Sequence, residues 1–349
     1  MKSIRPLSQY RFIRPIIELG RRVKFAFVRM RIRSSVTHIS GLRKIKLSKD
    51  GVIVLCLVKN GELVIEDFIN YYLDLGVEHM IFLDNGSQDQ TAELASKYTK
   101  VTVLRSHFPF RNDGDMRLRE YLTDYYGYGR WSLCVDIDEY FDYPHSNLIS
   151  LNQFIKYLIN YGYTAVVTQM LDMFPEQLQR QRSTPFIRSA HKYYMIDNLV
   201  KEKYRIWDSG RAALPVNPDH ASITGGIRKA LFDASPSLTK HALIYHSSKT
   251  RRDKWGHFLD KGVVADVSCV LLHYKFTSVF FQQVEEAVKK EHHFRNSSEY
   301  KQYHHVLKDL TVIDFPISNA SIWSGVDKLI EQNLLNTSSA YEQWSLSIG

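Results

Sequence analysis

The chain has few cysteines and no long apolar run. Both features limit the classes of protein to which it can belong. Its three cysteines, Cys56, Cys134 and Cys269, lie in separate apolar stretches without the close spacing of a zinc or redox motif. We expect buried thiols in a reducing compartment. No stretch approaches the roughly 18–20 consecutive apolar residues of a membrane-spanning helix, and no apolar leader with a cleavage site is evident. We therefore expect a cytoplasmic protein.

Acidic residues are nearly missing from the N-terminal region. Residues 1–45 contain 12 Lys or Arg against the single acid Glu18, whereas the rest of the chain has 34 basic and 36 acidic residues. The apolar residues between these charges leave two interpretations open: a basic amphipathic helix on an anionic membrane surface, or a helix packed on the rest of the protein. Under the first, the protein is peripheral on the inner face of the cytoplasmic membrane. Because the remainder is nearly neutral, we expect no nucleic acid partner.

From residue 51 onward, apolar strands alternate with helices. Strands are expected at Val52–Val58, His79–Leu83, Val101–Leu104 and Trp131–Ile137, with helices at Glu62–Leu75, from Asp89 through Tyr98 and near Met116–Tyr126. Short strand–helix connections predict an α/β fold with a mostly parallel central sheet flanked by helices. With 44% hydrophobic residues, the 349-residue chain can bury a full core.

Beyond residue 150 the alternation weakens. We expect strands at Ala165–Gln169, Ala242–His246 and Val270–Phe276, a helix near Ser278–Glu291, an irregular stretch from Pro175 to about Thr239, and a frayed tail over Asn336–Gly349. The predicted organisation is a basic arm (1–48), a first half (49–150) and a second half (151–310) of one α/β domain, and a C-terminal helical extension (311–349).

Polar residues directly follow several predicted strands. Lys59 and Asn60 follow the first, Asp84 and Asn85 the second, and Asp136-Ile137-Asp138-Glu139 the fourth. Since ligands bind beyond the carboxyl ends of parallel strands, these residues are expected to share one crevice. Asp84 can hydrogen-bond a ribose or base, and Lys59 a phosphate, although Asp84-Asn85-Gly86-Ser87 is equally typical of a simple turn.

The triplet Asp136-Ile137-Asp138 suits a hard divalent cation. Two carboxylates at a strand end can bind Mn²⁺ or Mg²⁺ and leave coordination positions for water and phosphate oxygens. A lone acidic triplet is more often a solvated strand end. The buried lead-in Trp131-Ser132-Leu133-Cys134-Val135 favours the functional interpretation, because three acids at such a position need a cation or several donors nearby.

Taken together, the motifs over residues 51–305 resemble the bacterial family-two-like glycosyltransferases of the GT-A fold. The resemblance rests on Val58-Lys59-Asn60, Leu75-Gly76-Val77-Glu78-His79, Asp84-Asn85-Gly86-Ser87, Asp136-Ile137-Asp138-Glu139-Tyr140, Met170-Leu171-Asp172-Met173-Phe174, Gly225–Phe232, Leu238-Thr239-Lys240, Leu271–Phe276 and the segment from Glu285 to Tyr303. There are two departures: the family's acid after Lys-Asn is Gly61 here, with Glu62 one place later, and its Ser-x-His is replaced by Tyr245-His246-Ser247-Ser248.

The resemblance implies a metal-dependent glycosyltransferase that transfers a sugar, with inversion, from a nucleotide-diphosphate-sugar to a glycan or lipid-linked acceptor. Residues 49–150 would form the nucleotide-sugar-binding half and residues 151–310 the acceptor-binding half. The expected context is cell-surface polysaccharide or lipopolysaccharide synthesis. It implies that Asp136 and Asp138 hold Mn²⁺ or Mg²⁺ and the diphosphate, with His273 a further ligand and Lys275 neutralising phosphate. His273 considered alone is more often a core histidine, and the resemblance reverses that interpretation. Candidate bases are Asp172 and Glu285. Gly225-Gly226 before Arg228 is either a loop closing over the diphosphate or an ordinary turn.

Two other function classes remain open from the sequence. A nucleotidyltransferase can use a similar α/β half with metal-binding aspartates, but the sequence lacks a Gly-rich phosphate loop after the first strand, which argues against it. A non-catalytic protein acting through the basic arm on membrane or nucleic acid would confine function to residues 1–45.

Overall fold

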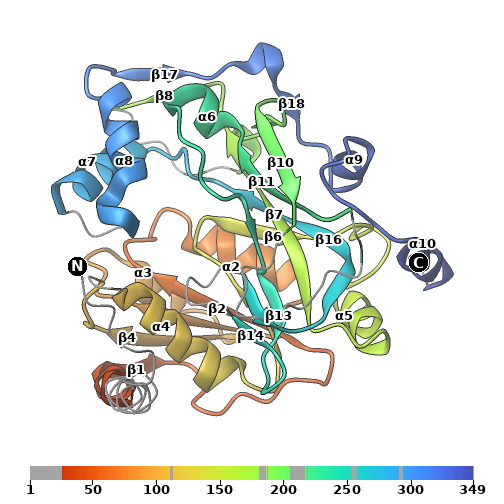
Figure 1. Cartoon of the computed structure of the whole chain (residues 1–349). Coiled ribbons are helices and arrows are strands. Elements are labelled where there is room, and N and C mark those ends of the chain that lie inside the picture. The colour runs from red at the N-terminus through yellow and green to blue at the C-terminus, as the bar shows by residue number, and fades with distance from the viewer. Residues whose placement is uncertain are drawn as a thin grey trace, which may run out of the picture.

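The structure is a computed structural model that describes residues 26–110, 113–180, 186, 188–204, 217, 219–252, 258–290 and 294–348. Twelve of its strands form one sheet, whose main path runs β1-β4-β3-β2-β5-β13-β7-β16-β6 (Figure 1). The strands on this path are β1 (Val36–Ser40), β2 (Val52–Val58), β3 (His79–Asp84), β4 (Val101–Ser106), β5 (Trp131–Cys134), β6 (Glu139–Asp142), β7 (Ala165–Phe174), β13 (Leu243–Tyr245) and β16 (Val264–His273).

Most strands of this path point the same way. β2 is parallel to β3 and β5, β3 is parallel to β4, and β7 is parallel to β16. The short strand β13 is antiparallel to both β5 and β7, so the two parallel groups share one direction. The predicted α/β fold, with a large, mostly parallel central sheet flanked by helices, is confirmed. Its carboxyl ends meet at one edge.

The alternation of β2 separates two cores. Val54 and Cys56 face a core that contains α2 (Ile65–Asp74), α3 (Thr91–Ala95) and α5 (Leu151–Asn160). Leu55 and Leu57 face the opposite core, which is covered by α4 (Gly114–Leu122). Because every residue of β2 is buried, the strand is a continuous apolar run. The three cysteines are buried, as predicted.

The second half of the chain contains more regular structure than its sequence indicates. The stretch expected to be irregular forms β8 (Gln177–Gln179), η2 (Arg188–Ala190), β9 (Tyr193–Tyr194), the hairpin β10–β11 (Leu199–Lys203 and Ala221–Gly225) and α6 (Ile227–Phe232), with segments outside the described residues. Short strands and one-turn helices carry weak periodicity, which explains the wrong prediction. α7 (Phe280–Lys290) and α8 (Phe294–Leu307) pack with α6 around a separate aromatic core.

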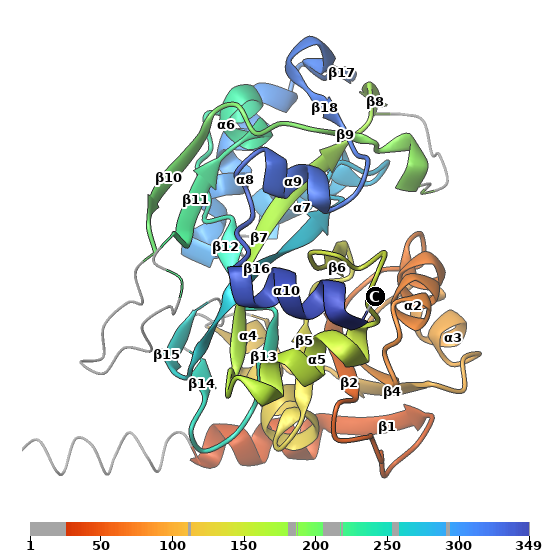
Figure 2. The ribbon, with the colours of Figure 1, turned by 90° about the vertical axis from the view of Figure 1, so that its right-hand side faces the viewer.

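The C-terminal segment is packed, so the expected frayed tail is wrong for residues 336–348. Helix α10 (Ser339–Ile348) lies beside α5 (Figure 2). The ring of the fully buried Tyr341 lies 5.0 Å from that of Tyr157, and Trp344 lies 5.2 Å from the same ring. These aromatic contacts hold the short terminal helix on the domain.

The remaining elements of the second half are β12 (Thr239–Lys240), β14 (Arg251–Arg252), β15 (Leu259–Lys261), β17 (Val312–Asp314), η3 (Ile317–Asn319), β18 (Ser321–Ile322) and α9 (Asp327–Glu331).

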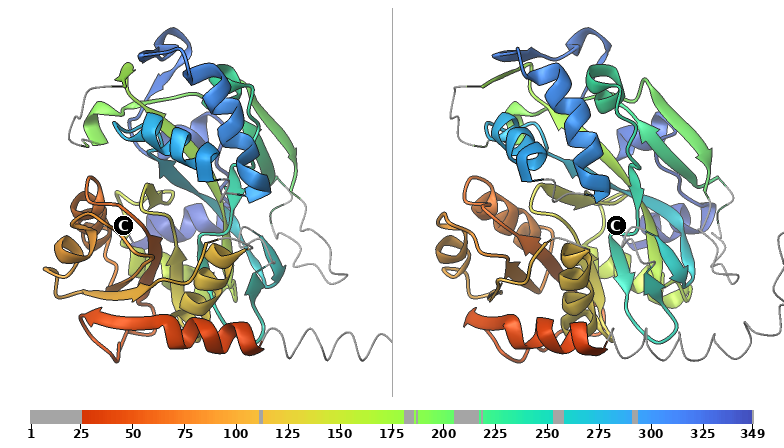
Figure 3. Two further views of the ribbon diagram at one scale, coloured as in Figure 1. Left: turned by 90° about the vertical axis from the view of Figure 1, so that its left-hand side faces the viewer. Right: turned by 60° about the vertical axis from the view of Figure 1, so that its left-hand side comes forward.

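The described part of the basic arm packs on the domain. Residues 26–35 form a helix, and β1 pairs with β4 as the edge strand of the sheet, so the sheet begins before residue 48 (Figure 3). Ile32 and Ile45 are buried in the core beneath α4. Residues 1–25 of the predicted amphipathic helix lie outside the described residues. In the part of the chain that is described, no helix is long and apolar enough to cross a membrane.

His79 on β3 makes the stability of the fold pH-dependent. Burial, with Arg130 adding to it, lowers the pKa of the imidazole from 6.5 to about 4, and its Nε2 lies 2.9 Å from Thr102 Oγ1. Since the unfolded chain takes up this proton near pH 6.5, the contribution of His79 is complete above that pH and is lost as pH falls toward 4, by up to about 3 kcal/mol. Urea unfolding measured from pH 7 to about pH 4.5 should show this decrease in the free energy of unfolding. The decrease should be smaller in His79→Gln and the same as in the parent in the exposed control His305→Gln. Equal pH dependence of His79→Gln and the parent would contradict the assignment.

Candidate active site

Strand register brings charged residues of three strands side by side. His273, the last residue of β16, pairs with Asp172 of β7 on one side and with Glu139 of β6 on the other. β6 follows β5 through the turn that contains Asp136 and Asp138, so the acidic triplet reaches the same place. The structure therefore brings Asp136, Asp138, Asp172 and His273 together at the carboxyl edge of the sheet.

The outer layer of this cluster is open to solvent. The side chains of Asp136 and Asp138 are 40% and 32% exposed. Asp136 Oδ1 lies 2.6 Å from a guanidinium nitrogen of Arg119 on α4, and Asp138 Oδ2 lies 3.3 Å from His273 Nε2. Burial opposes the protonation of His273, but Asp138 and Asp172 outweigh it and raise its pKa to about 9. The same His273 charge holds the pKa of Asp138 below its usual value, although burial acts to raise it.

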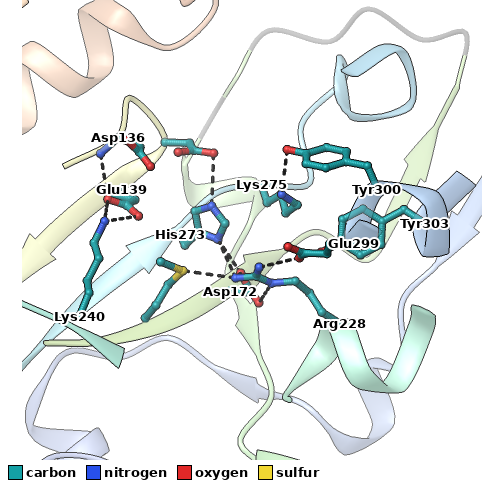
Figure 4. Close-up of polar contacts among 12 residues, drawn as sticks. Asp136, Glu139, Asp172, Arg228, Lys240, His273, Lys275, Glu299, Tyr300 and Tyr303 are labelled. Atoms are coloured by element: carbon teal, nitrogen blue, oxygen red, sulfur yellow. Dashed lines mark hydrogen bonds and ion pairs between the residues drawn. The ribbon is translucent and has the colours of Figure 1, made fainter. Parts of the chain in front are cut away.

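The inner layer consists of buried ion pairs that fix the outer one (Figure 4). Lys240 of β12 donates to both carboxylate oxygens of Glu139, at 2.6 and 2.5 Å, while Glu139 also accepts from the Asp136 backbone N–H. Arg228 of α6 donates Nε to Asp172 Oδ2 at 2.7 Å and Nη2 to Oδ1 at 2.9 Å. Asp172 Oδ1 also lies 2.5 Å from His273 Nδ1. Because these pairs are buried, the geometry above them is preorganised.

Helix α8 extends the cluster. Its Glu299 lies 3.0 Å from Arg228 Nη1 and accepts a hydrogen bond from the Tyr303 hydroxyl. Lys275 Nζ lies 4.8 Å and 5.4 Å from the ring centroids of Tyr300 and Tyr303. Burial disfavours the charge on Lys275, but the surrounding Tyr300, Tyr303 and Glu299 raise its pKa above the usual value. The expected phosphate-neutralising Lys275 thus lies beside the cluster as a cation.

No protein-family model and no curated protein matches the chain. Among solved structures, it is similar to TarS of S. aureus at 14% identity and a TM-score of 0.34, over 74% of this chain and 73% of that one. It is also similar to UDP-glucose pyrophosphorylase from Acinetobacter baumannii at 10% identity and a TM-score of 0.25, over 76% and 88%. The UTP-bound form matches at 8% identity, with the same TM-score and the same coverage. Similarities this low carry no argument about activity.

The residues after β2 and β3 lie at the expected edge, but several are used within the protein. Asp84 is fully buried, accepts from the Ser87 N–H at 2.7 Å and pairs with Arg105 at 2.8 Å. Asn85 donates its amide to the carbonyls of Ser106 and Phe108. Asn60 accepts from the Gln88 N–H, and Lys59 is exposed. The turn interpretation therefore accounts for Asp84 and Asn85, whereas Lys59 remains available to solvent at this edge.

Both candidate bases, Asp172 and Glu285, form ion pairs with arginines. Arg228 and His273 surround Asp172 and hold the pKa of its carboxyl well below its usual range, against the effect of burial. A carboxylate held by two cations is a weak base and a strong orienting group. Glu285 lies on α7, where its carboxylate pairs with Arg180 at 2.8 Å, apart from the interactions of the cluster. The contacts of Asp172 indicate that it positions His273.

The contacts of Gly225-Gly226 and Arg228 differ from those expected of a phosphate loop. Both glycines have positive φ, 97° and 68°, and a Cβ on Gly225 would lie 2.3 Å from the Asn198 carbonyl oxygen. This tight turn into α6 requires glycine without any loop closure. Arg228, expected to contact the diphosphate, is buried and directed at Asp172 and Glu299.

The donor atoms present suit a cation held by few protein ligands. Within the described residues, no group of three or more His, Cys, Asp or Glu side chains is arranged to hold a metal ion. The candidate pair is Asp138 Oδ2 and His273 Nε2, with Asp172 on the second imidazole nitrogen, an arrangement common around metal-bound histidines. Mg²⁺ and Mn²⁺ in nucleotide sites often use one or two protein ligands plus phosphate oxygens. These residues fit such an ion when it displaces the Nε2 proton of His273, since a histidine binds metal only as the neutral imidazole.

Several members of the cluster were not predicted as site residues. Arg119, Lys240, Glu299 and Tyr300 are set by tertiary contacts that no single motif encodes. Lys240 carried the clearest signal, because a lysine within the apolar stretch from Leu238 to Tyr245 requires a buried acid nearby. His246, which departs from the family pattern, lies 3.8 Å from the sulfur of Cys134, in contacts separate from the acidic cluster. A surface hollow of about 400 Å³ is lined by residues of β8 and η2, not by the charged cluster.

Proposed function

We propose that the protein is a metal-dependent glycosyltransferase that uses a nucleotide-diphosphate-sugar as donor and a glycan or lipid-linked acceptor. One observation carries the proposal: two partly exposed carboxylates and an imidazole lie at the carboxyl edge of a parallel sheet, over buried ion pairs that hold them in place. Enzymes preorganise charge in this way where charge develops during a reaction. The family resemblance of the sequence motifs supplies the type of donor.

In this proposal, Asp138 and His273 hold Mn²⁺ or Mg²⁺, and Asp136 adds its charge beside them. A cation bound there would offset the negative charge of the diphosphate leaving group as the sugar–oxygen bond breaks. Asp172 keeps the Nδ1 proton of His273 in place, so that Nε2 faces Asp138. Arg119 and Lys275 are the cations beside this pair that can meet phosphate oxygens. Lys59 is the candidate phosphate contact after β2.

The test is the identity of the phosphorus product. The protein is incubated with Mn²⁺ and a panel of sugar nucleotides of each common base, and ³¹P NMR follows the phosphates, with water as the default acceptor. Release of a nucleoside diphosphate from one donor, abolished by chelator, is the expected result. Pyrophosphate formed from a nucleoside triphosphate and a sugar phosphate would instead identify a nucleotidyltransferase. No turnover of any sugar nucleotide, with or without added glycans, would contradict the proposal.

A further inference from the structure

A surface patch of aromatic, apolar and basic side chains lies away from the charged cluster. It is formed by Phe27 and Met30 of the 26–35 helix, by Arg33, and by Tyr125 and Tyr128 in and directly after η1 (Thr123–Gly127). Their exposed fractions are 56% for Phe27, 60% for Met30, 57% for Tyr125 and 61% for Tyr128. Large side chains exposed together in this way indicate an interaction surface. We call it the N-terminal patch.

Helix geometry explains why these residues face outward. Ile32 is buried and Val28 packs against the same core, so this side of the helix faces the sheet. Phe27, Met30 and Arg33, which recur at intervals of three, lie on the opposite side. The Arg33 guanidinium carbon lies 5.9 Å from the centre of the Tyr125 ring, and Arg29 pairs with Asp124 of η1. The helix and η1 therefore form one continuous surface.

The charge of residues 26–49 is of one sign, and the acid beside them, Asp124 of η1, is paired with Arg29. Residues 26–49 contain no acid, and all of their basic residues are exposed: Arg29, Arg31, Arg33, Arg43, Lys44, Lys46 and Lys49. In sequence, residues 1–25 add seven more basic residues against Glu18. Basic residues around exposed aromatic and apolar side chains are typical of surfaces that dock on anionic bilayers, with Tyr at the level of the headgroups. An acidic protein partner would match the charge but would not account for Phe27 and Met30 between the arginines.

We propose that the N-terminal patch, with the basic residues of 26–49, docks on an anionic lipid bilayer. Phe27 and Met30 would enter the interface, and Arg33 of the patch and Arg43 of the basic residues would contact headgroups. This is independent of the proposed catalytic function. Membrane docking would combine the two interpretations of the basic arm. The 26–35 helix packs on the domain through Ile32, and its other side would contact the membrane. Helix α4 continues into η1 and also carries Arg119, which pairs with Asp136. The membrane-docking surface and the charged cluster would therefore be connected through α4.

The test is sedimentation of the full chain with phosphatidylcholine vesicles, with or without an equimolar share of phosphatidylglycerol. Binding is expected only with the anionic lipid and should weaken as salt is raised. Replacing Arg33 and Arg43 together with glutamine should weaken partitioning roughly 25-fold, about fivefold for each charge. Phe27→Ser with Met30→Ser should weaken it at least about tenfold. Matched controls are Lys203→Gln with Lys308→Gln and Val200→Ser with Ile322→Ser, all exposed residues on other surfaces.

Three outcomes would overturn the proposal. Equal binding to vesicles with and without phosphatidylglycerol would show that the basic residues are not used. Undiminished binding of both patch variants would show that residues outside the patch bind the membrane. Absence of vesicle binding, together with self-association that the patch variants abolish, would identify the surface as a protein interface. Thermal unfolding of each variant, unchanged from the parent, establishes that the exposed substitutions leave the fold intact.

Discussion

Asparagine in place of Asp138 is expected to lower nucleoside diphosphate release roughly 10²–10³-fold, the usual effect of removing one preorganised electrostatic group from an active site. The amide keeps the size of the side chain but loses the negative charge that faces His273 Nε2 at 3.3 Å. Because this side chain is partly exposed, the thermal unfolding temperature should change little. The rate is measured by coupled detection of the released diphosphate at saturating donor and Mn²⁺.

The control for this prediction is Asp309→Asn, since the side chain of Asp309 is largely exposed and lies after α8. It should retain the activity of the parent. If Asp138→Asn kept more than half of the activity, the acidic triplet would be a solvated strand end, and the charged cluster would be structural. A large loss in both variants would point to a general effect of lowered charge instead of a role of Asp138.

Methionine in place of Lys240 is expected to destabilise the fold by about 3–5 kcal/mol, the usual cost of breaking a buried ion pair from one side. The Glu139 side chain is 2% exposed, so it cannot regain water when the lysine is removed. Burial already raises the pKa of Glu139, with Lys240 opposing that rise, and the carboxyl must then take up a proton or remain buried and charged. Urea unfolding at pH 7 measures the change.

The double variant Glu139→Gln with Lys240→Met separates this explanation from simple loss of packing. Removing both charges should restore most of the lost stability, because no buried charge is left unpaired. A single variant within about 1 kcal/mol of the parent would contradict burial of the pair. If the double variant lost more free energy of unfolding than the two single variants lose together, the pair would contribute through contacts other than its charges.

The first half of the fold could be predicted because its strands are long and apolar and its connections are short. β2 begins and ends at the predicted residues, Val52 and Val58, and β3 and β4 extend the predicted strands by one or two. β5 is shorter than predicted, because the chain turns at Asp136 and Asp138 and returns as β6. The strands β10 and β11 were missed because they are short and pair across residues 204–220, and helix α10 was missed because it depends on contacts with the distant helix α5.

The candidate site was predictable where chemistry follows strand ends and unpredictable where it depends on packing. Asp136, Asp138 and His273 were found through motif and strand position, and the structure brings them together. Asp172 was a candidate base from the sequence, but no sequence pattern reports that Arg228 and His273 surround its carboxylate. Lys240 and Glu299 come from segments remote in sequence, so only the folded arrangement identifies them as partners.

The most direct test of the account is isothermal titration calorimetry of nucleoside diphosphates with the full chain, with Mn²⁺ and then with chelator, repeated on Asp138→Asn. We expect that one nucleoside diphosphate binds, that binding requires the cation, and that the substitution weakens binding at least about tenfold, a loss of about 1.4 kcal/mol. Binding of equal strength with chelator, or to the Asp138→Asn protein, would contradict the claim that this edge of the sheet is the donor site.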